Sequence, residues 1–351
     1  MQDLQTKVQT SGRKYRVGIV GAGSIGCFLS AILAQDPDLE LLLFGRDHMG
    51  LELAAHGLTA SWQDGSEHFQ ASVATVAFYT SYVSLIEADV VLLTVKATAL
   101  ATLVHQIKPH LRPDVPVIAL QNGIGITDMI QSQLHNPVYR AIVPFNVVSA
   151  GPGRFQQTSS GCLLWPQSSA AVVEYLQQVL LSQGLDVAIS TDMQAAEYGK
   201  LVLNLNNALN AVSDLPLRAQ LLDRHWRLLL AAAMREWLAI CAYEGVKPQQ
   251  FTALKPELLP FVLRLPDWLF SRVAARMLRI DPEARLSMSA DMSAGRRTEI
   301  AFLNGAVVRL GQRYDIPTPV NAAIVDLVHH KEQQPTSVAD PRQLCRQLKL
   351  S

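Results

Sequence analysis

The chain has 351 residues, of which 49% are hydrophobic and 17% are charged. This balance excludes a disordered chain, and the length is sufficient for two domains of ordinary size. Lysines and arginines together number 30, as do aspartates and glutamates, so the formal net charge is zero. Because there is no basic surplus, we expect no nucleic-acid partner.

The first residues and the cysteines bear on location. Residues 1–14 are polar and lack an apolar segment, so we expect a flexible N-terminal tail and not a signal peptide. No stretch reaches about 18 uninterrupted apolar residues, which predicts no membrane span. The four cysteines stand far apart without metal-ligand spacing, so we expect a cytoplasmic protein with reduced thiols and no metal site.

The most informative early segment is Val17–Gly26, which reads VGIVGAGSIG. An apolar run ends in three glycines, and residues 27–33 continue at helical spacing, so the segment predicts a strand, a tight turn and a helix. This is the dinucleotide-binding fingerprint in its required context. The alternative is a glycine-rich turn in a fold that binds nothing. The cofactor-binding residues expected here are Gly21, Ala22, Gly23, Ser24, Ile25 and Gly26.

Each glycine of this loop has an expected purpose. Gly21 permits the tight turn, Gly23 lets the backbone approach a pyrophosphate, and Gly26 lets the helix pack closely on the strand. The helix N-terminus then offers its free N–H groups to the anion.

Short apolar runs alternate with helical patterns over the first half of the chain. Their near-continuous apolar character is typical of a parallel sheet covered on both faces. The predicted strands are Tyr15–Val20, Leu39–Phe44, Asp89–Val95, Val115–Leu120 and Ala141–Val148. Gly57–Glu67 is expected to form a small excursion, and Gly161–Trp165 and Asp186–Ser190 are expected to add outer strands.

The residue that follows the second predicted strand bears on the cofactor. Arg46 is the first charged residue after that strand, 20 residues beyond Gly26, and Asp47 follows it. An arginine at this point accommodates the 2′-phosphate of NADP, whereas an acid binds the ribose 2′-hydroxyl of NAD. We favour NADP(H) because Arg46 precedes Asp47, and a solvated surface arginine is the alternative.

Polar residues follow two further predicted strands. Lys96 comes after one apolar run and Asn122 after another. Ligands of open parallel sheets lie at the carboxyl ends of the strands, so we expect both side chains to face the cofactor. The alternative for each is an ordinary turn residue.

The pattern becomes almost entirely helical near Thr191. Thr191 and Asp192 are suitable N-caps for a long helix that runs to about Val212. We therefore expect a Rossmann-type domain over residues 15–191 and a helical domain over residues 192–351.

This long helix carries an unusual polar stripe. Lys200, Asn204 and Asn207 recur at i, i+4 and i+7, which places them on one face. Asparagine is a mediocre helix former, and a stripe of this kind suits the wall of a wet cleft. The alternative is a solvent-exposed face. A lysine ammonium beside a ketone can stabilise the oxygen anion formed by hydride attack and then protonate it.

Two later segments have both structural and functional interpretations. Pro256–Ile280 is apolar, and its four arginines are compatible with a membrane surface. We favour the plainer interpretation, which is an interdomain or dimer contact. Further on, Ser287 and Asp291 suit the start of a helix, and Thr298 could cap the next one and leave Glu299 near its positive end.

With these residues assembled, the chain resembles the ketopantoate reductase (2-dehydropantoate 2-reductase) family from about Tyr15 to about Lys331. The order and spacing of six motifs carry the resemblance, and the later motifs are more specific than the glycine loop. They are GAGSIG at Gly21–Gly26, VKA at Val95–Ala97, QNG at Gln121–Gly123, KLVLN at Lys200–Asn204, SMxxD at Ser287–Asp291 and TEIxxxNG at Thr298–Gly305.

The resemblance implies a fold and a reaction. The expected fold is an α/β Rossmann NADP-binding domain followed by an all-α C-terminal domain like that of 6-phosphogluconate dehydrogenase, with the active site between them. The expected reaction is NADPH-dependent reduction of ketopantoate to pantoate, in pantothenate biosynthesis. The expected ligand is therefore a small 2-oxo acid. The sequence does not decide whether the protein forms a homodimer.

Carried over by position, the resemblance also implies residue roles. Lys200 is the implied general acid, and Glu299 acts beside it. Asn204, Asn207 and Ser287 hold the substrate. Arg46 and Lys96 serve the phosphorylated ribose, and Asn122 lies near the nicotinamide.

The chain departs from the family on the substrate side. Counted from Lys200, the second asparagine comes one residue early, so Asn206 or Asn210 can take the part of Asn207. Ser213–Leu217 also lacks the asparagine that classical members use on substrate. A reductase of a different 2-oxo acid is therefore one alternative, and a non-catalytic NADP(H)-binding protein is another.

Overall fold

The computed structural model describes residues 14–65, 68–72, 74–275, 278 and 283–350. The expected tail thus lies outside the described residues except for Lys14, as does part of Pro256–Ile280. By contacts the chain divides into two compact units, each described here by itself. The first comprises the described residues of Met1–Gln121 and Ile126–Met193, and the second those of Asn122–Gly125 and Gln194–Ser351.

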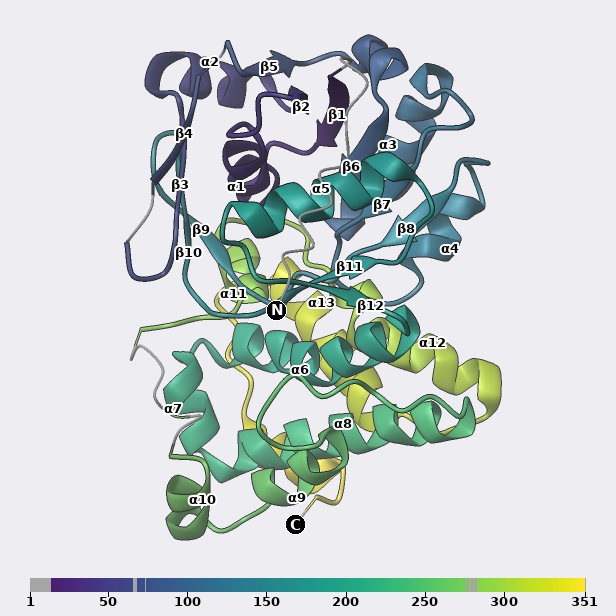
Figure 1. Ribbon diagram of the computed structural model, residues 1–351. Helices are drawn as coiled ribbons and strands as arrows, with labels where there is room; N and C mark the ends of the chain where they lie inside the picture. Colours follow the sequence, from purple (N-terminus) through teal and green to yellow (C-terminus); the bar gives the residue numbers. More distant parts are fainter. Residues whose placement is uncertain (1–13, 66–67, 73, 276–277, 279–282, 351) are drawn as a thin grey trace, which may run out of the picture. The chain divides into compact units, whose positions relative to one another are not determined.

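A six-stranded sheet forms the centre of the first unit (Figure 1). Its strand order is β5-β2-β1-β6-β7-β8, and all five neighbouring pairs are parallel. The strands are β1 (Tyr15–Val20), β2 (Leu39–Phe44), β5 (Val76–Tyr79), β6 (Val90–Leu93), β7 (Val117–Ala119) and β8 (Val138–Arg140). Because the chain goes to opposite sides of β1, the order reverses there, as in a doubly wound sheet.

The predicted strands agree with this sheet to different degrees. The bounds of β1 and β2 are as predicted, and β6 and β7 are shorter than predicted. The predicted strand Ala141–Val148 is wrong, since β8 ends at Arg140 and β9 begins at Val147. Pro144 lies in the interval and has no N–H to give to a strand ladder.

Short strands that the sequence pattern did not separate form a second, four-stranded sheet in the first unit. Its order is β4-β3-β10-β9, with β3 (Leu58–Ser61), β4 (His68–Ala71), β9 (Val147–Gly151) and β10 (Arg154–Gln157). The expected excursion at Gly57–Glu67 therefore contains a strand, β3. The two predicted outer strands are β11 (Leu163–Pro166) and β12 (Val187–Ser190), which pair in parallel with each other.

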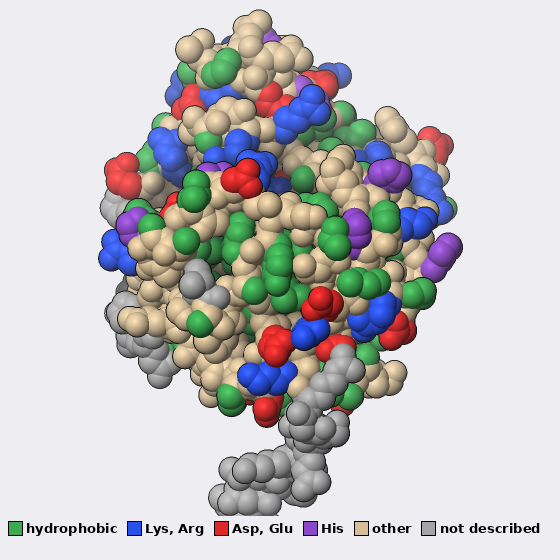
Figure 2. Space-filling model, turned by 90° about the horizontal axis from the view of Figure 1, so that it is seen from above, with side chains coloured by type: hydrophobic (Ala, Val, Ile, Leu, Met, Phe, Trp, Pro, Cys, Tyr) green, Lys and Arg blue, Asp and Glu red, His purple; other side chains and the backbone are tan. Residues whose placement is uncertain are grey.

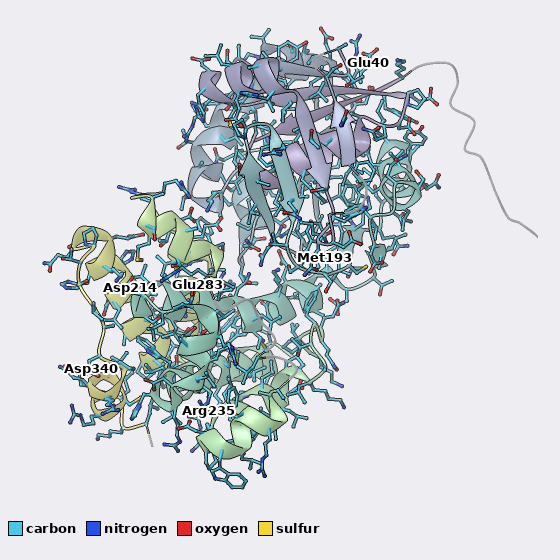
Figure 3. The ribbon with its side chains drawn as sticks, turned by 90° about the vertical axis from the view of Figure 1, so that its left-hand side faces the viewer. Glu40, Met193, Asp214, Arg235, Glu283 and Asp340 are labelled. Carbon is cyan, nitrogen blue, oxygen red and sulfur yellow. The ribbon has the colours of Figure 1, made fainter. Side chains whose placement is uncertain are left out.

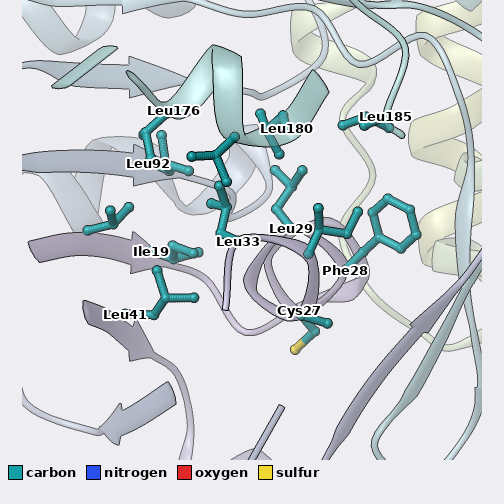
Figure 4. Close-up of a cluster of buried hydrophobic side chains, with 14 of the residues drawn as sticks. Ile19, Cys27, Phe28, Leu29, Leu33, Leu41, Leu92, Leu176, Leu180 and Leu185 are labelled. Atoms are coloured by element: carbon teal, nitrogen blue, oxygen red, sulfur yellow. The ribbon is translucent and has the colours of Figure 1, made fainter. Parts of the chain in front are cut away.

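Helices cover both faces of the six-stranded sheet. On one face α1 (Ser24–Leu33) and α5 (Ala171–Ser182) bury leucines against β1, β2 and β6, as Figure 4 shows for Leu33 and Leu176. On the other face the 3-10 helix η1 (Tyr82–Glu87) lies against β1, where Gly18 leaves room for Leu85. The remaining helices of this unit are α2 (Asp47–His56), α3 (Ala97–Ile107), η2 (Lys108–His110) and α4 (Ile126–Gln131).

The second unit is helical, as expected. Its long helix α6 (Met193–Ser213) begins directly after Asp192, and Figure 3 labels Met193 and Asp214 at its two ends. Leucine and valine side chains of α6 pack against α8 (Arg224–Tyr243) and the later helices. The other elements are α7 (Leu217–Leu222), η3 (Pro256–Leu258), α9 (Leu259–Leu263), α10 (Asp267–Val273), α11 (Ser287–Ser293), η4 (Ile300–Phe302), α12 (Asn304–Tyr314), α13 (Pro319–Gln333) and α14 (Pro341–Gln347).

Two surface observations complete the fold. Positive and negative side chains are interspersed on the face shown in Figure 2, in keeping with the zero formal charge. Among the described residues, no helix has the length and apolar character needed to cross a membrane.

Candidate active site

The glycine loop between β1 and α1 has the geometry expected of a pyrophosphate site. Gly21 has a φ of +126°, and a Cβ there would lie 2.6 Å from the Val95 nitrogen. At Gly26 a Cβ would lie 2.0 Å from the Gly21 oxygen, so both positions are closed to a side chain. At Gly23, by contrast, a Cβ would meet no atom within 4 Å. The space in front of the helix is therefore open where a ligand has to approach.

The first turn of α1 supplies the donors for this space. Gly23 is the N-cap residue, with extended backbone and no capping side chain. The first N–H groups of a helix have no partner inside the helix, so those of Ser24 and Ile25 are oriented toward the space in front of it. Ala22 is buried at the start of the turn. The residues present therefore fit a dinucleotide pyrophosphate.

Arg46 lies close to this loop. It is the N-cap residue of α2, its side chain is exposed, and Asp47 is the first residue of that helix. The preceding Gly45 packs on the loop, because a Cβ at Gly45 would lie 2.6 Å from the Ala22 Cβ. The Arg46 backbone thus lies next to the predicted pyrophosphate site, and its side chain is exposed.

Lys96 follows β6, the neighbour of β1 on the side opposite to β2. It is exposed and is the N-cap residue of α3, two residues after the loop threonine Thr94. The Thr94 hydroxyl donates to the Gly21 oxygen at 2.8 Å. This hydrogen bond fixes the glycine turn from the neighbouring strand, and the sequence analysis did not single out Thr94.

A buried polar group at the end of β7 was also missed. The Gln121 amide donates to the Leu93 oxygen at 2.9 Å, while its Oε1 has no hydrogen-bond partner among the described residues. Arg140, also buried, donates to the carbonyl oxygens of Ala119 and Gln121. Only the position of Gln121 directly after a strand could have signalled this group, since Arg140 lies 19 residues further along the chain.

Asn122 belongs by its contacts to the helical unit. Residues 122–125 cluster with the second unit, and the Ile124 N–H donates to the Phe302 oxygen at 3.0 Å. Gly123 makes this approach possible, with a φ of +101° and a Phe302 oxygen 2.5 Å from where its Cβ would be. The Asn204 amide donates to Asn122 Oδ1 at 3.5 Å. The segment after β7 thus brings Asn122 to the polar stripe of α6.

The polar stripe of α6 is not a solvent-exposed face. Asn204 and Asn207 are only 9% and 8% exposed, which contradicts the alternative of a solvated surface, and Lys200 is half-buried. Each of these three residues is on the same side of one helix. The arrangement gathers a half-buried ammonium and two buried amides.

The structure separates the asparagines that the sequence left interchangeable. Asn206 Oδ1 accepts a hydrogen bond from Gln220 at 2.7 Å. Asn210 donates to the Leu215 oxygen at 3.0 Å and accepts from the Leu286 N–H at 2.9 Å. The Asn207 side chain, by contrast, makes no hydrogen bond to any described residue. Asn206 and Asn210 therefore connect helices, whereas Asn207 retains its hydrogen-bonding capacity.

Ser287 begins α11, directly after the Leu286 that Asn210 holds. It is exposed, and the N-cap position belongs to Leu286 without a capping side chain. Asp291, which the helix-start interpretation paired with Ser287, is 2% exposed and instead forms an ion pair with Arg296 at 3.0 Å. A helix does start at Ser287, as the helix-start interpretation predicts, but neither of these two side chains caps it.

Glu299 is 9% exposed and precedes η4. The expectation that Thr298 caps the next helix is wrong, because its N–H and hydroxyl both donate to Glu332 Oε1, at 2.9 and 2.8 Å. Burial opposes ionisation of Glu332, but the hydrogen bonds from Thr298 and the interaction with His329 together outweigh it and lower the pKa of that carboxyl. A residue of α13 thus fixes the backbone that carries Glu299.

Comparisons with known proteins match almost the whole chain. The model of the family described as ketopantoate reductase PanE/ApbA matches residues 17–169, and the model of that family's C terminal matches residues 192–332. A 2-dehydropantoate 2-reductase of Caulobacter vibrioides is 26% identical over 89% of this chain and 98% of that protein. Another, from Lactococcus lactis, is 24% identical over 91% and 98%.

Solved structures give the same result at the level of the fold. A PanE/ApbA family ketopantoate reductase from Ralstonia eutropha is 28% identical and superposes with a TM-score of 0.77, over 92% of this chain and 100% of that one. D-mandelate dehydrogenase, solved with NADH and anilino(oxo)acetate, is 24% identical with a TM-score of 0.72, over 91% and 99%. The chain belongs to the ketopantoate reductase family, oxidoreductases that act on a CH–OH group.

Proposed function

We propose that this protein reduces ketopantoate to pantoate with NADPH, with Lys200 as the general acid. The observation that carries the proposal is the buried polar face of α6, where Lys200, Asn204 and Asn207 share one side of a helix. Such a face matches the needs of a small anionic substrate that carries a ketone and a hydroxyl group.

The residues of this face have complementary tasks. Bound NADPH supplies the hydride. The Lys200 Nζ stabilises the negative charge that develops on the ketone oxygen and then donates a proton to it. Asn204 and Asn207 hydrogen-bond the substrate carboxylate and hydroxyl without adding charge. Ser287 adds a hydroxyl, and Glu299 acts beside Lys200 on substrate or cofactor hydroxyls.

The first unit has the matching task of holding the cofactor. The amides of the loop from Gly21 to Gly26 bind the pyrophosphate, and Arg46 and Lys96 bind the phosphorylated ribose, with Asn122 near the nicotinamide. Support for NADP comes from the exposed side chain of Arg46, whose backbone lies next to the loop. In this proposal residues 15–191 bind the cofactor and residues 192–351 the substrate, in a cytoplasmic protein that forms a homodimer. A dimeric ketopantoate reductase from Staphylococcus aureus supports the last point.

A second candidate is a reductase of a bulkier or more apolar 2-oxo acid. The Asn210 side chain hydrogen-bonds the backbone of Leu215 and Leu286, and Ser213–Leu217 contains no asparagine. This chain therefore has fewer side-chain amides for a substrate hydroxyl than classical members of the family. The similarity in fold to a D-mandelate dehydrogenase is in keeping with this candidate.

Steady-state kinetics with a panel of 2-oxo acids test the proposal. We expect kcat/KM for ketopantoate to exceed that for pyruvate, 2-oxoisovalerate and the aryl 2-oxo acid derived from D-mandelate. A kcat/KM for the aryl acid far above that for ketopantoate would establish the second candidate. Tight NADPH binding without reduction of any of these acids would establish a non-catalytic protein.

A further inference from the structure

One carboxylate joins three helices around the start of α6. Glu244 is the C-cap residue of α8. Its Oε2 accepts a hydrogen bond from the Tyr198 hydroxyl of α6, and its Oε1 accepts one from the Tyr314 hydroxyl of α12 at 2.5 Å. Tyr198 is 5% exposed.

Trp237 holds the same residue of α6 from a second direction. Its indole is fully buried, and its Nε1 donates to the backbone carbonyl oxygen of Tyr198 at 3.0 Å. The Trp237 and Tyr198 rings are in contact, with centroids 4.7 Å apart. Both the backbone and the side chain of Tyr198 are therefore fixed by α8 and the residue that follows it.

The next residue of α6 is fixed by close packing. A Cβ at Gly199 would lie 2.0 Å from the Gln249 oxygen, so only glycine permits this approach. The Gln249 N–H in turn donates to the Ala195 oxygen at 2.7 Å. The segment after α8 thus lies directly on the helix one residue before Lys200.

The geometry of an α-helix connects these contacts with Lys200. Successive residues turn by about 100°, so Lys200 lies about 200° from Tyr198, on the opposite side of α6. A helix held at Tyr198 and Gly199 cannot rotate about its axis without breaking these contacts. Residues on the far side of the helix therefore constrain the direction in which Lys200 leaves α6.

Burial and the hydrogen bond from Tyr198 to Glu244 both raise the pKa of the Tyr198 phenol above its ordinary value. The phenol therefore remains a donor throughout the neutral pH range.

We propose that Tyr198 and Glu244 are positioning residues that aim the Lys200 ammonium by fixing the rotation of α6. The inference rests on the proposed function, in which Lys200 protonates the substrate oxygen. Loss of the Tyr198 hydroxyl should then reduce the rate of the chemical step and leave the binding of substrate and cofactor nearly unchanged.

The test compares Tyr198→Phe with the matched variant Tyr314→Phe. Each removes one phenol hydroxyl from the same Glu244 carboxylate, but only Tyr198 is on α6. We expect kcat per NADPH-binding site to fall about tenfold in Tyr198→Phe. A misplacement of about 1 Å costs roughly a hundredfold, and the remaining contacts of α6 keep the displacement smaller than that. The KM of the 2-oxo acid and the Kd of NADPH should stay within twofold. Tyr314→Phe should retain kcat within twofold.

Equal kcat values for the two variants, each counted per NADPH-binding site, would overturn the inference. Glu244→Gln supplies a second comparison, because the amide oxygen still accepts one phenol and should restore part of the rate lost in Glu244→Ala. If Tyr198→Phe does not fold, Trp237→Phe removes the other hydrogen bond to Tyr198 and should lower kcat in the same way.

Lys200→Ala separates this inference from the proposed function. If Lys200→Ala loses turnover while Tyr198→Phe keeps it, only the positioning inference fails. If Lys200→Ala itself keeps the wild-type kcat, the general acid is wrong, and the inference fails with it.

Discussion

Gly23 and Gly26 are separated by two residues, yet different constraints exclude a side chain at each. At Gly26 the obstacle is the protein itself, since a Cβ would lie 2.0 Å from the Gly21 oxygen. At Gly23 the protein leaves the position open and the backbone is extended, so alanine is compatible with the fold. Only a ligand would exclude a methyl group there.

This contrast gives a matched pair of variants. We expect Gly23→Ala to unfold at the wild-type urea concentration but to bind NADPH at least tenfold more weakly, because the methyl group occupies the approach of the pyrophosphate. Gly26→Ala should lose about 1–3 kcal/mol of unfolding free energy through overpacking. Urea denaturation and fluorescence titration measure the two effects. Wild-type NADPH affinity in Gly23→Ala would show that the pyrophosphate does not bind at this loop.

Arg46 and Asp47 give a second prediction for single residues. Loss of a charge-assisted hydrogen bond costs about 1.5–3 kcal/mol, and less for exposed groups, so Arg46→Ala should weaken NADPH about tenfold and NADH within twofold. Asp47→Ala is the control, because the acid would contact the 2′-hydroxyl of NADH if NAD were the cofactor. Equal losses of NADPH and NADH affinity in Arg46→Ala would mean that this arginine does not bind the 2′-phosphate.

At the scale of the element, the asparagines of α6 have two functions that the sequence could not separate, which are to connect helices and to form the polar face. Its register and its polar face were predictable, because leucine and asparagine alternate at helical spacing. The partners of the individual asparagines were not, since Gln220 and Leu286 come from later segments that only the fold brings to α6. The same limit applies to Thr298, whose acceptor Glu332 lies 34 residues further along the chain.

These two functions of α6 predict different effects for substitutions at Asn210 and Asn207. Asn210→Ala should lose about 1–3 kcal/mol of unfolding free energy, because it leaves buried partners without a hydrogen bond. Asn207→Ala removes no hydrogen bond to a described residue, so it should lose less stability but raise the KM of the 2-oxo acid. Thermal unfolding measures the loss of stability in both variants, and steady-state kinetics measure the KM of the 2-oxo acid. An unchanged KM in Asn207→Ala would remove this residue from the substrate site.

Strands were predictable to the extent that both of their faces are buried. β1 and β2 lie inside the six-stranded sheet, and their apolar runs, interrupted only by Arg16 and Glu40, predicted their bounds. β5 and β9 are short and mostly half-buried or exposed, so their sequences carry no comparable run. The interval between β8 and β9 was taken for a strand because it is apolar, although Pro144 interrupts it.

At the scale of the whole molecule, the sequence carried the fold class and the family, because the glycine loop and the later motifs keep their order and spacing. It placed Asn122 with the cofactor-binding strands, whereas residues 122–125 cluster with the helical unit. Sequence periodicity cannot show that a segment directly after a strand of one unit belongs by its contacts to the other unit. Residues 122–125 are such a segment, and they add the polar side chain of Asn122 to the helical unit.

The central claim is that the helical unit supplies the proton through Lys200, and turnover of Lys200→Ala measures it most directly. A positioned proton donor contributes about 10²–10⁴ in rate, so kcat should fall by a factor in this range while the Kd of NADPH stays within twofold. Lys255→Ala, an exposed lysine outside α6, is the matched control and should keep the wild-type kcat. A wild-type kcat in Lys200→Ala would contradict the account.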